Sequence, residues 1–306
     1  MKISLAIFLF ALGMAGSLLA GPDFKTTVPA RDEQPAAEAK KFPFEFDAEL
    51  AYIGDSDVSR GFRQINNFDE VYSLLRFVYT PRTKIGILRL GAGWERYGFN
   101  IASGLQVPDT LQSFNAVVGL DTQLSDSILV RFEAQPGVYG TGDFDGNTFN
   151  VPFLLGGTYI YSPELQFVFG VSVDFERKYP AFPGGGVRWH FASQWTLNAA
   201  LPTPRLEYEV NRNLMLYAGA NVKGSTFRTD NHFGDGSGDS RLNRAWLTYT
   251  EVRTGVGARW KISPEVSLSV EGGYMPYREF DFNRADIRYH HDGGAPYGAI
   301  ALNAAF

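Results

Sequence analysis

The sequence predicts an all-β fold: a transmembrane, antiparallel, up-and-down β-barrel of about 14 strands. Three observations predict it. Apolar and polar residues alternate along most segments after residue 43, short turns alternate with long loops, and the chain ends in an aromatic residue, Phe306. The segment LQFVFGVSVDFE (165–176) is typical, because every second residue from Leu165 is apolar and most of those between are polar or Gly. Side chains alternate faces along a strand, so one face needs either a second sheet or lipid to cover it.

The first 20 residues, MKISLAIFLFALGMAGSLLA, predict a secretory signal peptide with cleavage after Ala20. A lysine precedes an apolar run that is short for an anchoring helix, which is the alternative. No cysteine follows, so a lipid-anchored lipoprotein is excluded. Residues 21–42 are rich in Pro, Ala and charge, and we expect a flexible periplasmic lead-in, with a small plug inside the barrel as the alternative. The barrel is predicted over 43–306.

Composition narrows the classes of protein further. Without Lys2 the chain carries 27 basic and 33 acidic residues, which disfavours a nucleic-acid-binding surface. The absence of cysteine excludes a disulfide scaffold and any thiolate metal site. Aromatic residues are frequent (25 Phe, 15 Tyr, 5 Trp) although the mean hydropathy is only −0.15. A barrel that alternates apolar and polar residues has this combination.

The connections between the alternating segments are sorted by length. Short turns are predicted at 81–84, 125–127, 162–164, 192–194, 211–213 and 263–265, and longer Gly/Asp/Asn-rich loops at 55–70, 98–111, 140–148, 177–184, 225–246 and 277–296. A brief seventh connection lies around 202–204. Short periplasmic turns and long external loops are the layout of an outer-membrane barrel, whereas a sandwich has no reason to sort its loops.

Between these connections the predicted strands are 44–54, 71–80, 85–97, 112–124, 128–139, 149–161, 165–176, 185–192, 195–201, 204–210, 214–224, 247–261, 265–275 and 297–306. Most reach the nine to eleven residues that a tilted strand needs to cross a bilayer. The pair around Pro202 and Pro204 is short, and proline weakens a strand ladder. If that pair does not cross, the count falls to 12.

Aromatic residues on the apolar face lie close to the predicted short turns. We expect Tyr79, Tyr161, Trp189, Trp195, Trp260 and Phe306 to form a ring at the membrane interface, where amphipathic side chains settle.

The opposite face carries charge of both signs, which predicts a polar lumen. The inward candidates are Glu45, Asp47, Glu49, Arg76, Arg89, Asp121, Arg131, Glu133, Asp174, Glu176, Arg188, Arg205, Glu207, Glu209, Lys223, Glu251, Arg253, Arg259, Lys261 and Glu271, with His190 beside Arg188. One interpretation is a channel whose charge field selects solutes. The other is an interior filled by ion pairs and water that conducts little.

Catalytic, metal-binding and cofactor-binding residues are not predicted. No serine lies in a G-x-S-x-G elbow, and His290 and His291 with Asp286 and Asp292 are read as solvent-exposed loop residues. Asp143, Asp145 and Asn147 resemble the start of a calcium loop, but Thr148 takes the glycine position and Leu154 the position of the bidentate Glu, so a plain turn is favoured. The run Pro183 to Gly186 lacks the helix that a phosphate cradle needs.

The segment TPRLEYEVNRNLMLYAGANVKGSTFR (203–228), read with Phe306, resembles uncharacterised outer-membrane β-barrel proteins of Gram-negative bacteria of about 300 residues. The resemblance supports fold and location and implies no activity.

We therefore expect a monomeric outer-membrane barrel, in contact with lipid and with the barrel-assembly machinery through Phe306, that acts as a passive pore or transporter for small solutes. The alternatives are a non-conducting structural or ligand-binding barrel, and a transporter similar to the long-chain fatty-acid transporters. No enzymatic activity, cofactor, metal or nucleic-acid partner is expected.

Overall fold

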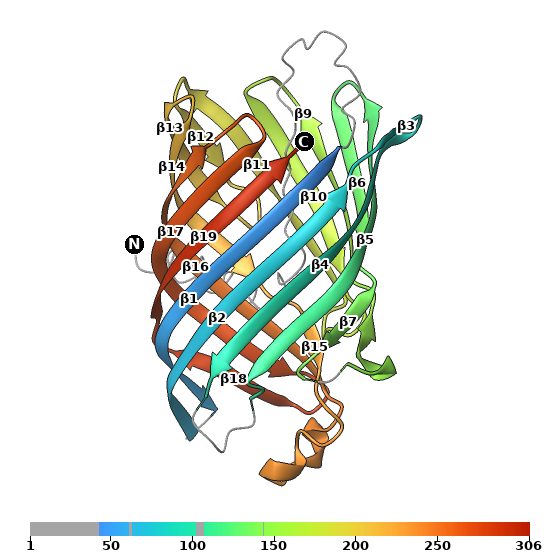
Figure 1. Ribbon diagram of the computed structural model, residues 1–306, viewed down its shortest axis with the longest axis vertical. Coiled ribbons are helices and arrows are strands. Elements are labelled where there is room, and N and C mark those ends of the chain that lie inside the picture. The colour runs from blue at the N-terminus through green and yellow to red at the C-terminus, as the bar shows by residue number, and fades with distance from the viewer. Residues whose placement is uncertain (1–42, 61–62, 102–106, 143) are drawn as a thin grey trace, which may run out of the picture.

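The computed structural model describes residues 43–60, 63–101, 107–142 and 144–306. The predicted signal peptide, the predicted lead-in and Asp143 lie outside the described residues. Within them, all strand segments belong to one sheet that closes on itself (Figure 1). No helix in this part of the chain is long and apolar enough to cross a membrane.

The described part of the chain forms 19 strand segments and three short 3₁₀ helices. The segments are β1 (Phe44–Arg60), β2 (Arg63–Tyr79), β3 (Arg82–Thr83), β4 (Gly86–Asn100), β5 (Thr110–Ser125), β6 (Ile128–Ala134), β7 (Gly137–Gly140), β8 (Phe149–Asn150), β9 (Phe153–Ile160), β10 (Leu165–Val173), β11 (Ala181–Ala192), β12 (Trp195–Asn198), β13 (Arg205–Asn211), β14 (Leu214–Lys223), β15 (Thr226–Arg228), β16 (Trp246–Lys261), β17 (Val266–Phe282), β18 (Ile287–Asp292) and β19 (Ala295–Ala305). The helices are η1 (Gly146–Thr148), η2 (Asp235–Ser237) and η3 (Ser240–Leu242).

These 19 segments make a closed antiparallel barrel of 14 strands in the described part of the chain. Five segments are continuations, because β3 extends β2, β7 extends β6, β8 leads into β9, β15 extends β14 and β18 leads into β19. The last strand pairs with the first, for example at Phe46↔Ala304 and Ile53↔Tyr297. The predicted fold class is confirmed, with the count of 14 and not 12, since β12 and β13 do pair, at Trp195↔Tyr208.

The connections are sorted as predicted, with short turns at one end of the barrel and longer loops at the other. Several strands, however, run further into the loop end than the sequence predicts. β1 continues to Arg60 and β17 to Phe282, and β18 lies inside the predicted loop 277–296. Backbone pairing continues there without apolar alternation, because one face of these segments no longer has to be apolar.

The wall of the barrel is uneven in height, and this divides the loop end in two. β1, β2, β16 and β17 have 16 or 17 residues, whereas β12 has four and β13 has seven. Beyond the ends of the short strands, β7 and β15 meet in a parallel bridge at Gly140↔Arg228 (lower right in Figure 1). The Thr141 amide also donates to the Arg228 carbonyl at 3.2 Å. The bridge separates a main compartment, bounded by β15–β18, β1, β2, β4, β5 and β7, from a side compartment bounded by β8–β14.

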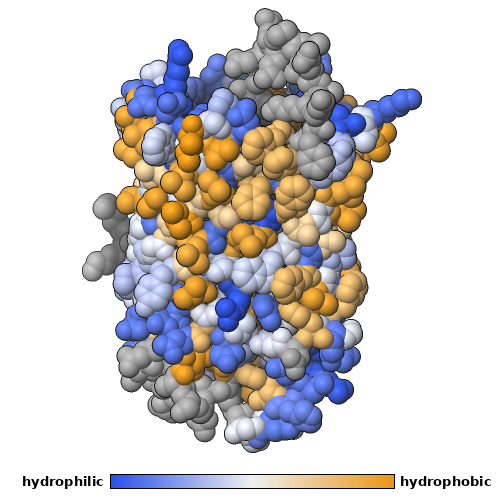
Figure 2. All heavy atoms as spheres, in the orientation of Figure 1, coloured by the Kyte–Doolittle hydropathy of each residue, from blue (hydrophilic) through white to orange (hydrophobic). Residues whose placement is uncertain are grey.

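The outer surface of the barrel is apolar. Large apolar side chains point outward all around it and are exposed, among them Leu50, Leu75, Val118, Phe169, Val256 (64%) and Val270 (55%). Figure 2 shows such residues gathered in a belt over the strands, with hydrophilic residues at the loop end. Monomeric soluble proteins rarely expose apolar patches of more than a few hundred Å², so this surface matches hydrocarbon and not water.

Glycines on the inner face of β14, β16 and β17 keep one wall smooth. Gly219, Gly255 and Gly273 are direct register partners across these three strands, and the row continues to Tyr297 on β19. A Cβ atom on Gly255 would lie 2.5 Å from the Tyr297 hydroxyl, and one on Gly257 would lie 2.4 Å from Cζ of Tyr217. Both tyrosine rings therefore lie flat against the wall in space that the glycines leave.

We expect Gly257→Ala to lower the free energy of unfolding by about 1–3 kcal/mol, because its methyl group overlaps the Tyr217 ring. Urea unfolding in detergent micelles, followed by tryptophan fluorescence, measures the change. Gly184→Ala on β11 is the matched control, since a Cβ atom there meets nothing within 4 Å. Equal effects of the two substitutions would contradict the packing described here.

Candidate functional site: the barrel lumen

A girdle of ion pairs lies inside the half of the barrel nearest the short turns. The Arg89 guanidinium donates to Glu45 at 2.9 Å and to Glu133 at 3.1 Å, and Arg76 pairs with Glu133 from the next strand. Arg131 donates to both oxygens of Asp121 at 2.6 Å. Because each of these three arginines has a carboxylate partner, the charges of the girdle on β1, β2 and β4–β6 are matched.

A second layer of charge crosses the main compartment nearer the loop end. Arg278 donates to Glu70 at 2.5 Å, and Arg253 contacts Glu251 at 2.6 Å and Glu70 at 3.4 Å. All four side chains are at most 1% exposed. Lys223 extends the layer by an ion pair of 2.9 Å with Glu49. Buried charges persist only when they are paired and hydrogen-bonded, so this layer is a fixed partition of the compartment.

Beyond that layer the main compartment is filled by an aromatic core. Tyr97 packs edge-on against Tyr249 with ring centroids 4.8 Å apart, and Phe280 lies 4.9 Å from Tyr249. Phe227 on β15 and Tyr139 on β7 join the core from the two sides of the bridge. The main compartment is therefore closed at the loop end by side chains of its own wall.

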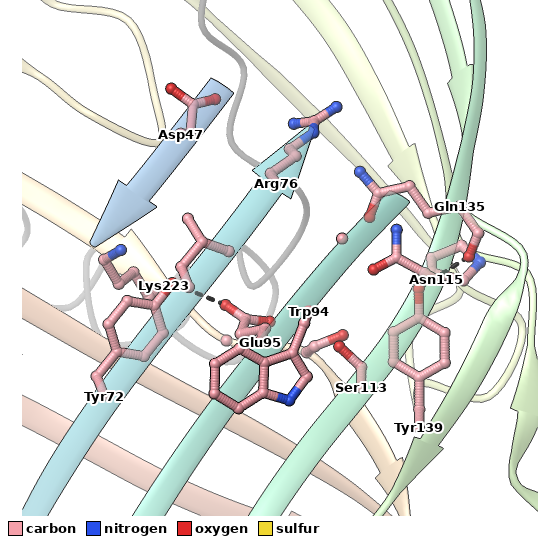
Figure 3. Close-up of a pocket in the computed structure, with 15 residues that line it drawn as sticks. Asp47, Tyr72, Arg76, Trp94, Glu95, Ser113, Asn115, Gln135, Tyr139 and Lys223 are labelled. Carbon is pink, nitrogen blue, oxygen red and sulfur yellow. Dashed lines mark hydrogen bonds between the residues drawn. The ribbon is translucent and has the colours of Figure 1, made fainter. Parts of the chain in front are cut away.

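A small chamber remains between the girdle and the core (Figure 3). Glu95 accepts hydrogen bonds from the hydroxyls of Tyr72 at 3.0 Å and Tyr97 at 2.9 Å. The Lys223 ammonium lies 4.2 Å from the centroid of the Tyr72 ring, and Asn115 and Gln135 face the same space. Its volume of about 80 Å³ holds a few water molecules and no larger solute.

The side compartment is closed at the loop end by one connection, residues 174–180 between β10 and β11. Buried Arg177 donates to the Thr226 hydroxyl on β15 at 3.1 Å and lies 3.4 Å from Asp174, which accepts from Asn150 at 3.0 Å. Glu176 pairs with Arg284 at 2.8 Å. Thr226 and Phe227 are successive residues of one strand, so their side chains take opposite faces of β15. The connection thus covers the face of the bridge that the aromatic core does not.

The structure separates the predicted lumen residues into three groups. Arg76, Arg89, Asp121, Arg131 and Glu133 form the girdle, whereas Glu251 and Arg253 belong to the buried layer, and Asp174 holds the β10–β11 connection. Arg188, His190, Glu207, Arg259 and Glu271 lie on β11, β13, β16 and β17. That all of them line an open lumen remains a prediction.

Sequence reasoning missed Glu70, Arg278 and Arg177. All three were assigned to loops, and the first two become strand residues only because β2 and β17 extend past the predicted ends. The one sequence signal for these three residues is that each is a charged residue within a predicted long loop.

The predicted interface aromatics lie at the short-turn end of the barrel. Tyr161, Trp189, Trp195 and Trp260 are exposed, and the Phe306 ring stacks on Phe44 with centroids 4.5 Å apart. Toward the loop end, Tyr52, Phe114 and Tyr274 are also exposed on the outer face. Their role at a membrane interface remains a prediction.

Residues considered for metal or catalytic chemistry do not assemble into a site in the described structure. Asp145 instead caps η1, where its carboxylate accepts from the Asn147 amide at 2.8 Å. His190 contacts the Thr196 hydroxyl and His232 contacts Asp235, whose pKa is lowered by hydrogen bonds from Asn243 and His232. His290 lies in β18, opposite Glu279; the side chains of His291 and Asp292 lie outside the description.

Comparison with known proteins gives a family and a set of distant barrels. The family model described as "Domain of unknown function (DUF6268)" matches residues 107–296. No curated protein matches the chain.

Solved structures with similar folds include outer-membrane proteins of Pseudomonas. The COG4313 outer membrane channel from Pseudomonas putida F1 shares 8% identity over 90% of this chain and 100% of its own, with a TM-score of 0.48. The toluene transporter TodX of P. putida shares 10% identity over 86% and 90% (TM-score 0.40). A Pseudomonas aeruginosa FadL homologue shares 12% over 87% and 90% (TM-score 0.41). Likeness at this level identifies neither substrate nor mechanism.

We expect Arg278→Met to destabilise the barrel by about 3–5 kcal/mol, because it leaves Glu70 buried without its principal partner. The double variant Arg278→Met with Glu70→Gln removes both charges and is expected to recover part of the loss. Urea unfolding in micelles measures both.

Arg241→Met in the loop between β15 and β16 is the control, because its guanidinium is exposed where it pairs with Asp239 and ion pairs of exposed groups contribute little to stability. A loss for Arg278→Met as small as that of the control would mean that the buried layer does not hold the compartment closed.

Proposed function

The chain belongs to the DUF6268 family, and we propose that it is a monomeric outer-membrane transport barrel that carries small polar solutes through its side compartment. The observation that carries the proposal is the unequal closure of the two compartments. An aromatic core and a buried ion-pair layer fill the main compartment, whereas one seven-residue connection covers the side compartment. The apolar outer surface supports a membrane location, and Phe306, exposed at the short-turn end, suits recognition by the barrel-assembly machinery.

In this proposal residues 174–180 are the gate. A small set of contacts anchors them. Hydrogen bonds join Arg177 to Thr226, Asp174 to Asn150, and Asn283 to the Glu176 carbonyl. At the surface, Glu176 pairs with Arg284 and the Phe175 ring packs on Phe153. Moving the connection away from β15 would open the side compartment without disturbing the core. Connections with few buried apolar contacts open at low free energy, which suits a gate.

A non-conducting barrel is the second candidate, and the filled main compartment favours it. An interior occupied by paired charges and aromatic rings stabilises a barrel without leaving a passage. Conductance separates the two candidates.

We expect wild-type protein in planar bilayers to give rare, brief openings. The double variant Asp174→Asn with Arg177→Met should give long-lived openings, because it releases the connection from β15 without leaving a buried charge unpaired. In the variant Glu176→Cys with Arg284→Cys, a short bismaleimide cross-linker should abolish the openings. The chain has no cysteine of its own, so the cross-link is specific.

The control is Asp239→Asn with Arg241→Met, which removes an ion pair at the same end of the barrel but outside the gate. Openings that persist after cross-linking would exclude the side compartment as the route. Silence of every variant, including Asp174→Asn with Arg177→Met, would favour the non-conducting barrel.

A further inference from the structure

The two walls of the short-turn half of the barrel differ in how their charges are satisfied. On β2 and β4–β6, Arg76, Arg89 and Arg131 each contact a carboxylate. On β11, β13 and β16 the described structure gives Arg188 and Arg259 no carboxylate within 4 Å, and Arg205 only a loose contact of 3.8 Å with Glu271. The strands that carry these three arginines line the side compartment or adjoin it.

Strand register places Arg188 and Arg205 in one row, with Arg259 four residues further toward the short turns. Arg188 on β11 pairs with Asn198 on β12, which pairs with Arg205 on β13. Adjacent strands lie about 4.8 Å apart, so Arg188 and Arg205 are separated by roughly 10 Å along one row. Arg259 on β16 lies within the electrostatic reach of both. Its only hydrogen-bond partner in the described structure is the Ser269 hydroxyl, at 3.4 Å.

The carboxylates nearby do not neutralise this cluster. Glu271 already accepts from the Tyr297 hydroxyl at 2.6 Å, lies beside the Tyr217 hydroxyl, and is the loose partner of Arg205. The Arg205 guanidinium stacks over the Tyr217 ring, 4.6 Å from its centroid, which fixes it in place. Glu207 lies on the same face but makes no ion pair with a described residue. Glu209 lies in the register row of Arg259 but is exposed and makes no ion pair with a described residue. Lys261 and His190 lie nearer the short turns and are exposed.

The glycines described above hold two tyrosine rings flat beside the cluster. Tyr217 and Tyr297 lie flat because Gly257 and Gly255 have no side chains. Half-buried guanidinium groups held close together repel one another, and an oxyanion relieves that repulsion through charge-assisted, bidentate hydrogen bonds.

We propose that Arg188, Arg205 and Arg259 bind the carboxylate of a small hydroxylated anion, such as a uronic acid. The site rests on the proposed function, of which it names the substrate class. Asn198 and Glu207, on the same face, supply a donor and an acceptor for solute hydroxyl groups. A neutral sugar could use only those two.

Equilibrium dialysis of the full chain in detergent micelles, with D-glucuronate and with D-glucose, tests the site without any need for transport. We expect wild type to bind glucuronate and not glucose. Arg188→Gln with Arg259→Gln should weaken glucuronate binding at least about tenfold, because each removes a charged hydrogen-bond donor. The control, Arg131→Gln with Arg76→Gln, makes the same change in charge in the girdle and should leave binding within about twofold.

Absence of glucuronate binding, equal binding of glucose, or an equal loss in the control would each overturn the site. Heat-modifiable migration on gels shows whether each variant is folded. Should Arg188→Gln with Arg259→Gln fail to fold, Arg259→Gln alone is used, with a loss of at least about threefold expected and an unchanged affinity overturning the site. Binding by a protein that never conducts would keep the site and remove the transport function. Conductance without glucuronate binding would keep the transport function and remove the site.

Discussion

The structure depends on one constraint: every outward side chain along the barrel must suit hydrocarbon while every backbone group is hydrogen-bonded within the sheet. An open sheet edge in lipid leaves polar groups unsatisfied at a cost of several kcal/mol each, so the sheet must close. The pairing of β1 with β19 achieves this closure. Once the exterior is apolar, the polar and charged residues are confined to the inner face. The structure of the interior then depends on how these residues pair.

The charged residues pair differently in the two compartments. Around the main compartment, carboxylates and guanidiniums are matched, and the remaining space is taken by aromatic rings. In the short-turn half of β11, β13 and β16 the arginines are poorly matched, and glycines keep the neighbouring wall smooth. The first arrangement favours a fixed structure, and the second leaves binding capacity for a solute. Under the proposed function, a single barrel combines a rigid half with a half that transports.

Most of the fold could be predicted from the sequence, because contact with hydrocarbon requires an apolar side chain at every second residue of a strand. The segment 165–176 shows this directly, since its apolar positions are outward in β10. The strand ends at the loop side could not be predicted. Segments that extend beyond the apolar belt keep their strand pairing without alternating apolar and polar residues, as around Glu70 on β2 and Arg278 on β17. The grouping of inward charges could not be predicted either, since the register that brings Arg188 near Arg205 but gives Arg131 to Asp121 depends on strand order and shear. Nothing in the sequence pattern indicates that β7 and β15 touch.

The low wall at β12 and β13 also affects the surrounding lipid. A strand needs about nine to eleven residues to cross the hydrocarbon layer, and β12 has four. Lipids beside it meet a hydrophobic height smaller than beside β1, so the bilayer must thin locally or the barrel must tilt toward that side. The hydrophobic mismatch therefore falls on the flank that carries the proposed gate, where bilayer thickness would bias the position of residues 174–180.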